Sequence, residues 1–95
     1  MPSRPEDAPA DYEKARTNVR AFVERGFERV NEKELDARIA NLEPIPMTTP
    51  KMIEENLFGL LVDLRIALYR PDQQGLLKEG ATRESLWQNL KEAVA

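Results

Sequence analysis

The first segment with a clear pattern of apolar and polar positions covers residues 11–30. At about 100° per residue, its apolar side chains form one continuous arc and its charged side chains lie opposite, which is typical of an amphipathic helix. The arc consists of Tyr12, Ala15, Val19, Phe22, Val23, Gly26, Phe27 and Val30. A glycine lowers helix propensity, so Gly26 indicates either a close crossing by another helix or an interruption, and we favour the crossing.

A second, shorter helix is predicted to begin near Glu32. Asn31 and Glu34 have the spacing of a capping box, with asparagine in place of the usual serine. The apolar stripe of this helix is narrow and consists of Leu35, Ile39 and Leu42. The prolines of residues 43–47 stop the helix, because proline has no N–H and disfavours the helical conformation of the residue before it. We therefore expect an extended linker there.

The longest apolar pattern lies in residues 50–70 and predicts the central helix of the fold. Thr48 or Thr49 can cap the start of this helix, and Pro50 fits its first turn. Pro71 cannot continue the helix and marks its end. Its main apolar stripe consists of Ile53, Leu57, Leu60, Leu61, Leu64, Ala67 and Leu68. This stripe alone would satisfy the packing of a helical bundle.

The same helix carries a second apolar cluster on nearly the opposite side, which consists of Phe58, Val62, Ile66 and Tyr69. Two polar strips separate the clusters. One holds Glu54 and Arg65, and the other holds Asn56, Asp63 and Arg70, which repeat every seven residues. Leaving the four apolar side chains in water would forfeit on the order of 6–12 kcal/mol, from about 1.5–3 kcal/mol each, so another surface must cover them.

Two surfaces could cover this second cluster. In one arrangement, helix 50–70 is central, with the first two helices on one side and residues 76–94 on the other. In the other arrangement, a partner protein or a second copy of the chain covers the cluster, because aromatic anchors among aliphatic residues are typical of the buried centre of an interface. We therefore take Phe58, Val62, Ile66 and Tyr69, with the neighbouring Arg65, as the candidate partner-binding residues.

The two ends of the chain complete the picture. Thr82 can cap a last helix that runs from Arg83 toward the C-terminus, with an apolar face made of Leu86, Trp87, Leu90, Ala93 and Val94. Residues 1–10 hold three prolines among small and charged residues, which predicts a flexible N-terminal tail. The fold class that follows is all-α: one domain over residues 11–95, built as a compact bundle of about four helices.

Composition narrows the function. The chain has 95 residues, of which 41% are hydrophobic and 33% are charged, as in one globular domain. A formal net charge of −3 argues against binding nucleic acid, which needs a concentrated positive field. The N-terminus has no apolar signal segment and no stretch is long and apolar enough for a bilayer, so we expect no membrane binding and a cytoplasmic location.

Candidate chemistry is sparse. The chain has no cysteine and no histidine, so it lacks the usual nucleophile, the usual general base and the commonest metal ligand. The pair Glu54 and Glu55 fits a solvated helix face better than a cation site, and the glycines fit no nucleotide-binding loop. Arg16 and Arg20 could anchor an acidic ligand or partner, but a position at the core margin, with the guanidinium reaching a nearby polar group or water, explains Arg16 better. We assign no catalytic, cofactor or metal residues.

These observations favour a non-enzymatic protein–protein interaction module that acts through apolar helix faces. An adaptor, an accessory subunit, an inhibitor and an antitoxin-like partner all fit, and self-association as a homodimer is one form of the same idea. The alternative is a small-molecule binder or cofactor-free enzyme with a pocket between helices. In that alternative, Tyr12, Tyr69, Arg16 or Arg65 would supply the polar groups of the pocket.

Overall fold

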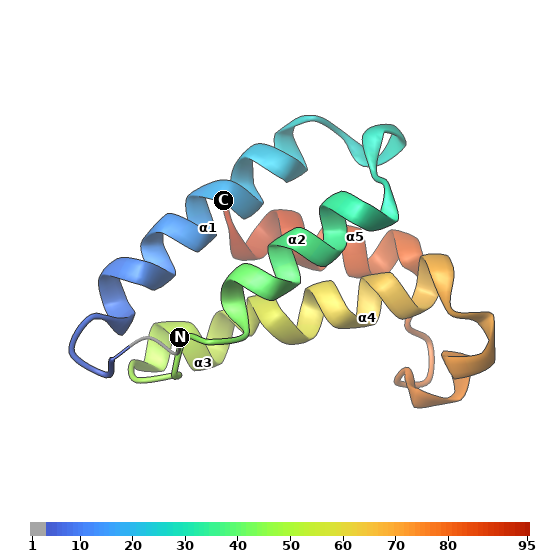
Figure 1. Ribbon diagram of the computed structural model, residues 1–95. Coiled ribbons are helices and arrows are strands. Elements are labelled where there is room, and N and C mark those ends of the chain that lie inside the picture. The colour runs from blue at the N-terminus through green and yellow to red at the C-terminus, as the bar shows by residue number, and fades with distance from the viewer. Residues whose placement is uncertain (1–3) are drawn as a thin grey trace.

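The computed structural model describes residues 4–95, and within them it is all-α, as predicted, with no strand. Its elements are α1 (Ala8–Glu24), η1 (Phe27–Arg29), α2 (Glu32–Leu42), α3 (Pro50–Glu55), α4 (Leu57–Tyr69), η2 (Pro71–Leu76) and α5 (Arg83–Ala93), where η denotes a 3₁₀-helix (Figure 1). Residues 1–3, which belong to the predicted tail, lie outside the described residues. No helix of residues 4–95 has both the length and the apolar content needed to cross a bilayer.

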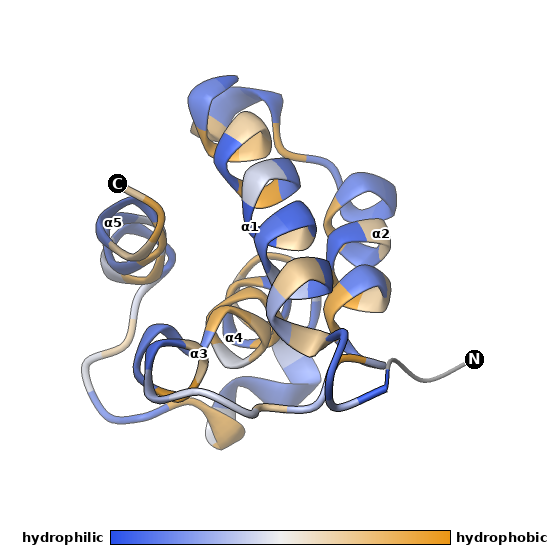
Figure 2. Ribbon diagram, turned by 90° about the vertical axis from the view of Figure 1, so that its left-hand side faces the viewer, coloured by the Kyte–Doolittle hydropathy of each residue, from blue (hydrophilic) through white to orange (hydrophobic). Residues whose placement is uncertain are grey.

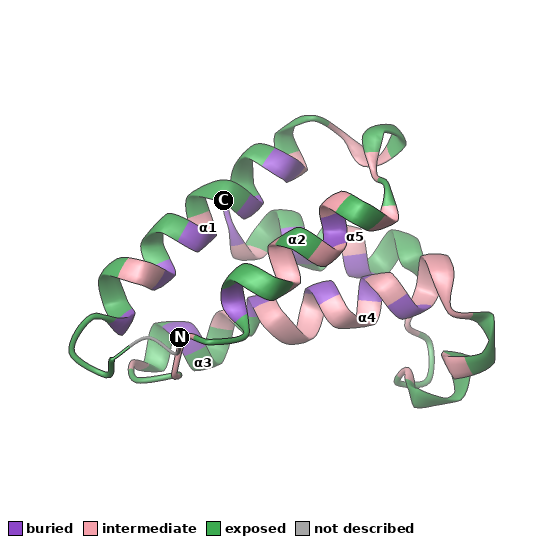
Figure 3. Cartoon of the chain, viewed as in Figure 1, coloured by how far each residue is buried: buried purple, intermediate pink, exposed green. Residues whose placement is uncertain are grey.

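Helix α4 is the centre of the bundle. It packs extensively against α2 and α5, and α1 in turn contacts α2 and α5. In the view of Figure 2, α4 lies below α1, with α5 on one side and α2 on the other. Leu57, Leu61 and Leu64 of α4 are fully buried, so its main apolar stripe forms the core, as the pattern predicts (Figure 3).

Helix α1 departs from the prediction at both ends. It begins at Ala8, three residues earlier than expected, and Ala8 is fully buried, while Pro9 fits the first turn because that turn needs no N–H from it. The helix ends at Glu24, and Gly26 follows with φ of 95°, a left-handed conformation that favours glycine. A Cβ at Gly26 would meet no atom within 4 Å. The predicted close crossing is therefore wrong, and Gly26 interrupts the helix.

The predicted single helix over residues 50–70 is also wrong, because it breaks at Asn56. This residue is left-handed, with φ of 47° and ψ of 48°, and separates α3 from α4. The break changes the helical phase, so a projection that spans it misplaces the residues of α3. Ile53, expected on the buried stripe, is 61% exposed, whereas its neighbour Met52 is 1% exposed.

The helix starts follow their capping residues. Asn31 Oδ1 accepts a hydrogen bond from the Glu34 N–H at 2.9 Å, and the hydroxyl of Thr49 accepts one from the Met52 N–H at 3.3 Å. Thr82 forms a reciprocal capping box with Ser85 at the start of α5. Each side chain satisfies a backbone donor that the helix leaves unpaired, which is why these predicted starts are confirmed.

Trp87 joins the last helix to the first part of the chain. Its ring lies edge-on to Phe22 of α1 and to Phe27 of η1, with centroid separations of 5.8 and 5.3 Å. Edge-to-face contacts of this kind stabilise aromatic pairs beyond the area that they bury. The tryptophan therefore packs at the core, as its place on the apolar face of the helix predicts.

Candidate interaction surfaces on α4

Two of the predicted partner-binding residues contact α2 and the turn before it. The hydroxyl of Tyr69 donates to the carbonyl of Val30 at 3.4 Å, and Arg65 Nε lies 2.6 Å from Asp36 Oδ1 in an ion pair. Burial, followed by the nearby charge of Glu32, raises the pKa of Tyr69. This side of the second apolar cluster thus meets α2, whereas the two arrangements considered from the sequence placed residues 76–94 or another protein against it.

The other three predicted residues differ in their surroundings. Ile66 is buried, and its carbonyl accepts a hydrogen bond at 2.7 Å from the side chain of Gln74 in η2. Phe58 is partly buried and packs against the core. Val62 is also partly buried, but it does not belong to the core or to the residues packed against it. Val62 is therefore the predicted residue that the bundle itself uses least.

An ion-pair network closes the interface between α2 and α4. Arg70 donates to Glu32 Oε1 at 2.7 Å, and Arg65 Nη2 lies 4.0 Å from the same oxygen. The third carboxylate of α2, that of Glu34, pairs with Arg25 at the end of α1 and with Arg38 one turn further along α2. All three carboxylates of α2, including Asp36, thus have arginine partners.

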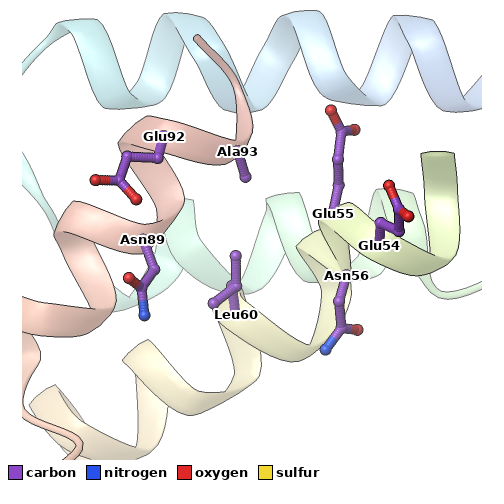
Figure 4. Close-up of a pocket in the computed structure, with 7 residues that line it drawn as sticks. All are labelled: Glu54, Glu55, Asn56, Leu60, Asn89, Glu92 and Ala93. Carbon is purple, nitrogen blue, oxygen red and sulfur yellow. The ribbon is translucent and has the colours of Figure 1, made fainter.

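The opposite side of α4, toward α5, is hollowed by two adjoining cavities of about 490 and 360 Å³. They share Asn56, Leu60 and Asn89, so together they form one groove, which we call the α4–α5 groove. Figure 4 shows its first part, with Leu60 between the wall formed by α3 and the start of α4 and the wall formed by α5. The remaining residues that line the groove are Glu54, Glu55, Asp63, Lys78, Glu79, Gly80, Ala81, Ser85, Leu86, Glu92 and Ala93.

The α4–α5 groove is acidic, and three of its carboxylates have no partner among residues 4–95. Five carboxylates and one lysine line it. Of these carboxylates, Glu55 is paired with Arg16, and Glu92 accepts a hydrogen bond from Gln88. The carboxylates of Glu54, Asp63 and Glu79 form no ion pair or hydrogen bond within residues 4–95. These three charges are therefore available to a cationic group from outside the chain.

A polar cluster lies beside the groove and joins α1, α3 and α5. The hydroxyl of Tyr12 donates a hydrogen bond to the carboxylate of Glu55, and Arg16 Nε lies 3.2 Å from both oxygens of that carboxylate. Arg16 Nη2 also donates to the carbonyl of Ala93 at 3.1 Å. Burial, followed by the hydrogen bond to the Glu55 carboxylate, raises the pKa of Tyr12 well above its usual value. The cluster is satisfied internally.

The two arginines considered as anchors for an acidic ligand have internal partners. Besides the contacts of Arg16, Arg20 Nε donates to the carbonyl of Val94 at 2.8 Å. The last carbonyls of a helix lack partners within it, and cations are favourable at this end of the helix dipole. Both arginines therefore cap α5, with Glu55 as the counter-ion of Arg16.

The α4–α5 groove was not predicted from the sequence, although the pattern of polar residues contains part of it. Asn56 and Asp63 belong to a polar strip with a seven-residue repeat, and these two residues line the groove, whereas Arg70, the third member of the strip, pairs with Glu32 of α2. The opposite wall comes from Glu79, Asn89 and their neighbours, which are distant in sequence, so only the packing of α5 on α4 brings the walls together. No group of three or more acidic, histidine or cysteine side chains within residues 4–95 is placed to hold a metal ion.

Comparison of the chain with known protein families, with curated proteins and with solved structures found no match.

Proposed function

We propose that this chain is a non-enzymatic protein–protein interaction module that holds a basic segment of a partner protein in the α4–α5 groove. The observation that carries the proposal is that the carboxylates on one side of α4 form ion pairs and three of those on the other side form none within residues 4–95. The carboxylates on the α2 side have arginine partners, whereas Glu54, Asp63 and Glu79 on the α5 side have none in the part of the chain that the structure describes.

The chemistry of the groove fits lysine and arginine side chains. A basic side chain brings a charge for the unpaired carboxylates and an aliphatic stem that packs on apolar atoms such as those of Leu60, at the base of the groove. The amide side chains of Asn56 and Asn89 add hydrogen-bonding groups beside the charges. The groove thus combines an apolar base with a polar, negatively charged rim, as partner-binding surfaces do.

The alternative of a small-molecule site or enzyme has weaker support. The four polar groups that it would use are Tyr12, Tyr69, Arg16 and Arg65, and each of them has a partner inside the chain. Two of them, Tyr12 and Arg16, are held by Glu55. A ligand would have to break these contacts before it could use the side chains.

A synthetic amphipathic peptide of lysine and leucine tests the proposal, with a glutamate–leucine peptide of the same pattern as control. In backbone amide NMR spectra, we expect the lysine peptide to shift the signals of Leu60, Asp63 and Asn89, and the glutamate peptide to leave them unchanged. Binding should weaken with added salt, because exposed charges are screened.

Matched charge variants sharpen this test. The double variant Asp63→Asn/Glu79→Gln should weaken binding of the lysine peptide by about two- to tenfold, as expected for the loss of two exposed charge pairs. The control Glu28→Gln/Glu43→Gln removes the same charge from exposed positions that do not line the groove. Equal weakening by the two double variants, or shifts spread over the whole surface, would contradict the proposal.

A further inference from the structure

Helix α3 is the least anchored helix of the bundle. It has six residues, too few to be stable without packing. Its backbone makes only sparse contacts with any other element, whereas α4 packs extensively on both neighbours. Met52 is its one buried residue, and Lys51, Ile53 and Glu54 are exposed. The packing that holds α3 in place therefore rests on one apolar side chain.

A single residue joins α3 to α4. Asn56 ends α3 by donating its backbone N–H to the carbonyl of Met52, and it starts α4 by accepting the N–H of Leu60. Its left-handed conformation is uncommon for residues other than glycine, and asparagine tolerates it better than most. A Cβ on Gly59 would lie 2.5 Å from the Asn56 side-chain amide, so the glycine leaves space for this joint.

Polar contacts at the end of α3 hold it against the rest of the bundle. Glu55, its last residue, binds Tyr12 and Arg16 of α1, and Arg16 is bound in turn to the carbonyl of Ala93. The side chains of Glu55 and Arg16 are only 15% and 11% exposed, so water screens their ion pair little. A second ion pair, between Lys51 and Glu13, is exposed and weaker.

We infer that α3 is a hinged strap, which opens as a unit about Asn56 while α1, α2, α4 and α5 stay folded, and that Glu55 with Tyr12 and Arg16 is the latch that holds it closed. Opening removes Glu54 and Glu55 from the wall of the α4–α5 groove and exposes Met52. The strap thereby couples the shape of the groove to the contact between α3 and α1. Breaking the latch opens the strap without unfolding the bundle.

Hydrogen exchange of the unmodified protein, followed by NMR at increasing low concentrations of urea, tests the hinge. The reporters in α3 are the amides of Ile53 and Asn56, which bond to Thr49 and Met52, and those in α4 are Leu61 and Leu64. We expect the α3 amides to exchange at least about tenfold faster, with little dependence on urea, since a local opening exposes little surface. If the amides of α3 and α4 showed the same protection from exchange and the same dependence on urea, the inference would be overturned.

Two neighbouring glutamates provide a matched test of the latch. Glu55→Gln removes the charge that pairs with Arg16, and it should speed exchange in α3 by about 10- to 100-fold while α4 is unchanged, the range expected for a lost charged hydrogen bond. The control Glu54→Gln removes the same charge one residue away, where it has no partner within residues 4–95, and should change neither set. Equal acceleration of α3 and α4 by Glu55→Gln would show that the cluster supports the whole fold and would overturn the strap.

Neither measurement uses a partner protein or a peptide, so the strap and the proposed function can fail separately. A protein that binds the lysine peptide but exchanges uniformly has the groove without the strap. A protein whose α3 opens but which ignores the peptide has the strap without the proposed partner.

Discussion

The two sides of α4 use the same types of residue in different ways. Toward α2, carboxylates of α2 face arginines at the end of α4, and Glu32 and Asp36 are paired with Arg65 or Arg70. Toward α5, Asp63 faces a groove that is lined by four further carboxylates and one lysine. One side is a closed, charge-balanced contact within the bundle, and the other is an open, negatively charged surface.

The difference shows which charges belong to the fold. Partly buried ion pairs between helices fix which surfaces meet, whereas an unpaired carboxylate in a groove contributes only to the field around the molecule. The three unpaired carboxylates of the groove account for as much negative charge as the formal net charge of −3. The ion pairs on the α2 side of α4 thus stabilise the fold, whereas the unpaired carboxylates on the α5 side attract positively charged groups.

Among substitutions in α4, the largest loss of stability is expected in its buried main apolar stripe. Leu64 is fully buried, so Leu64→Ala should lower the free energy of unfolding by about 2–5 kcal/mol, through lost burial and the cavity left behind. Urea unfolding followed by circular dichroism measures this. A loss below about 1 kcal/mol would mean that α4 is not the centre of the core.

Val62 tests the outward face between the two sides. Val62→Asp should lower the free energy of unfolding by about 1 kcal/mol, clearly less than Leu64→Ala, because the side chain is only partly buried and lies off the core. Sedimentation of the same samples addresses the predicted homodimer. A wild-type dimer that Val62→Asp dissociates would support self-association through this face, and a monomeric wild type would contradict it.

The smallest expected effects on stability come from neutralising one carboxylate on each side of α4, which compares the two sides directly. Glu32→Gln should lower the free energy of unfolding by about 0.5–1 kcal/mol, because it removes the partner of Arg70 and of Arg65 at a site that is about one-third exposed. Asp63→Asn, on the other side, should change it by less than about 0.5 kcal/mol. Both are read from urea unfolding at low and high salt, and the difference should shrink at high salt. Equal losses would erase the distinction between the two sides.

The elements of this fold could largely be predicted from local chemistry. The capping residues Asn31, Thr49 and Thr82 each precede a helix, because their side chains satisfy backbone donors of the residues that follow. The main stripe of the central helix is correct from Leu57 onward, since helical periodicity is a local property. Local signals of this kind need no knowledge of what packs nearby.

The interruptions could not be placed with the same certainty. Gly26 is compatible with a close crossing and with a helix end, and only its positive φ distinguishes them. Asn56 lies inside a strong apolar pattern on both sides, and nothing in that pattern marks a left-handed residue. The groove was missed for a related reason, because its walls join segments that the chain brings together only through tertiary packing.

The arginines that cap α5 bear on the order in which the fold assembles. Arg20 and Val94 are 74 residues apart in sequence, and Arg16 and Ala93 are 77 apart. Because contacts between such distant residues close a long loop, we expect them to form late in folding, after the more local packing of α4 against α5 and α2. Contacts that form this late should affect how fast the native bundle unfolds more than how fast it folds. The two arginines are thus expected to contribute kinetic stability, and their loss to shorten the lifetime of the folded state.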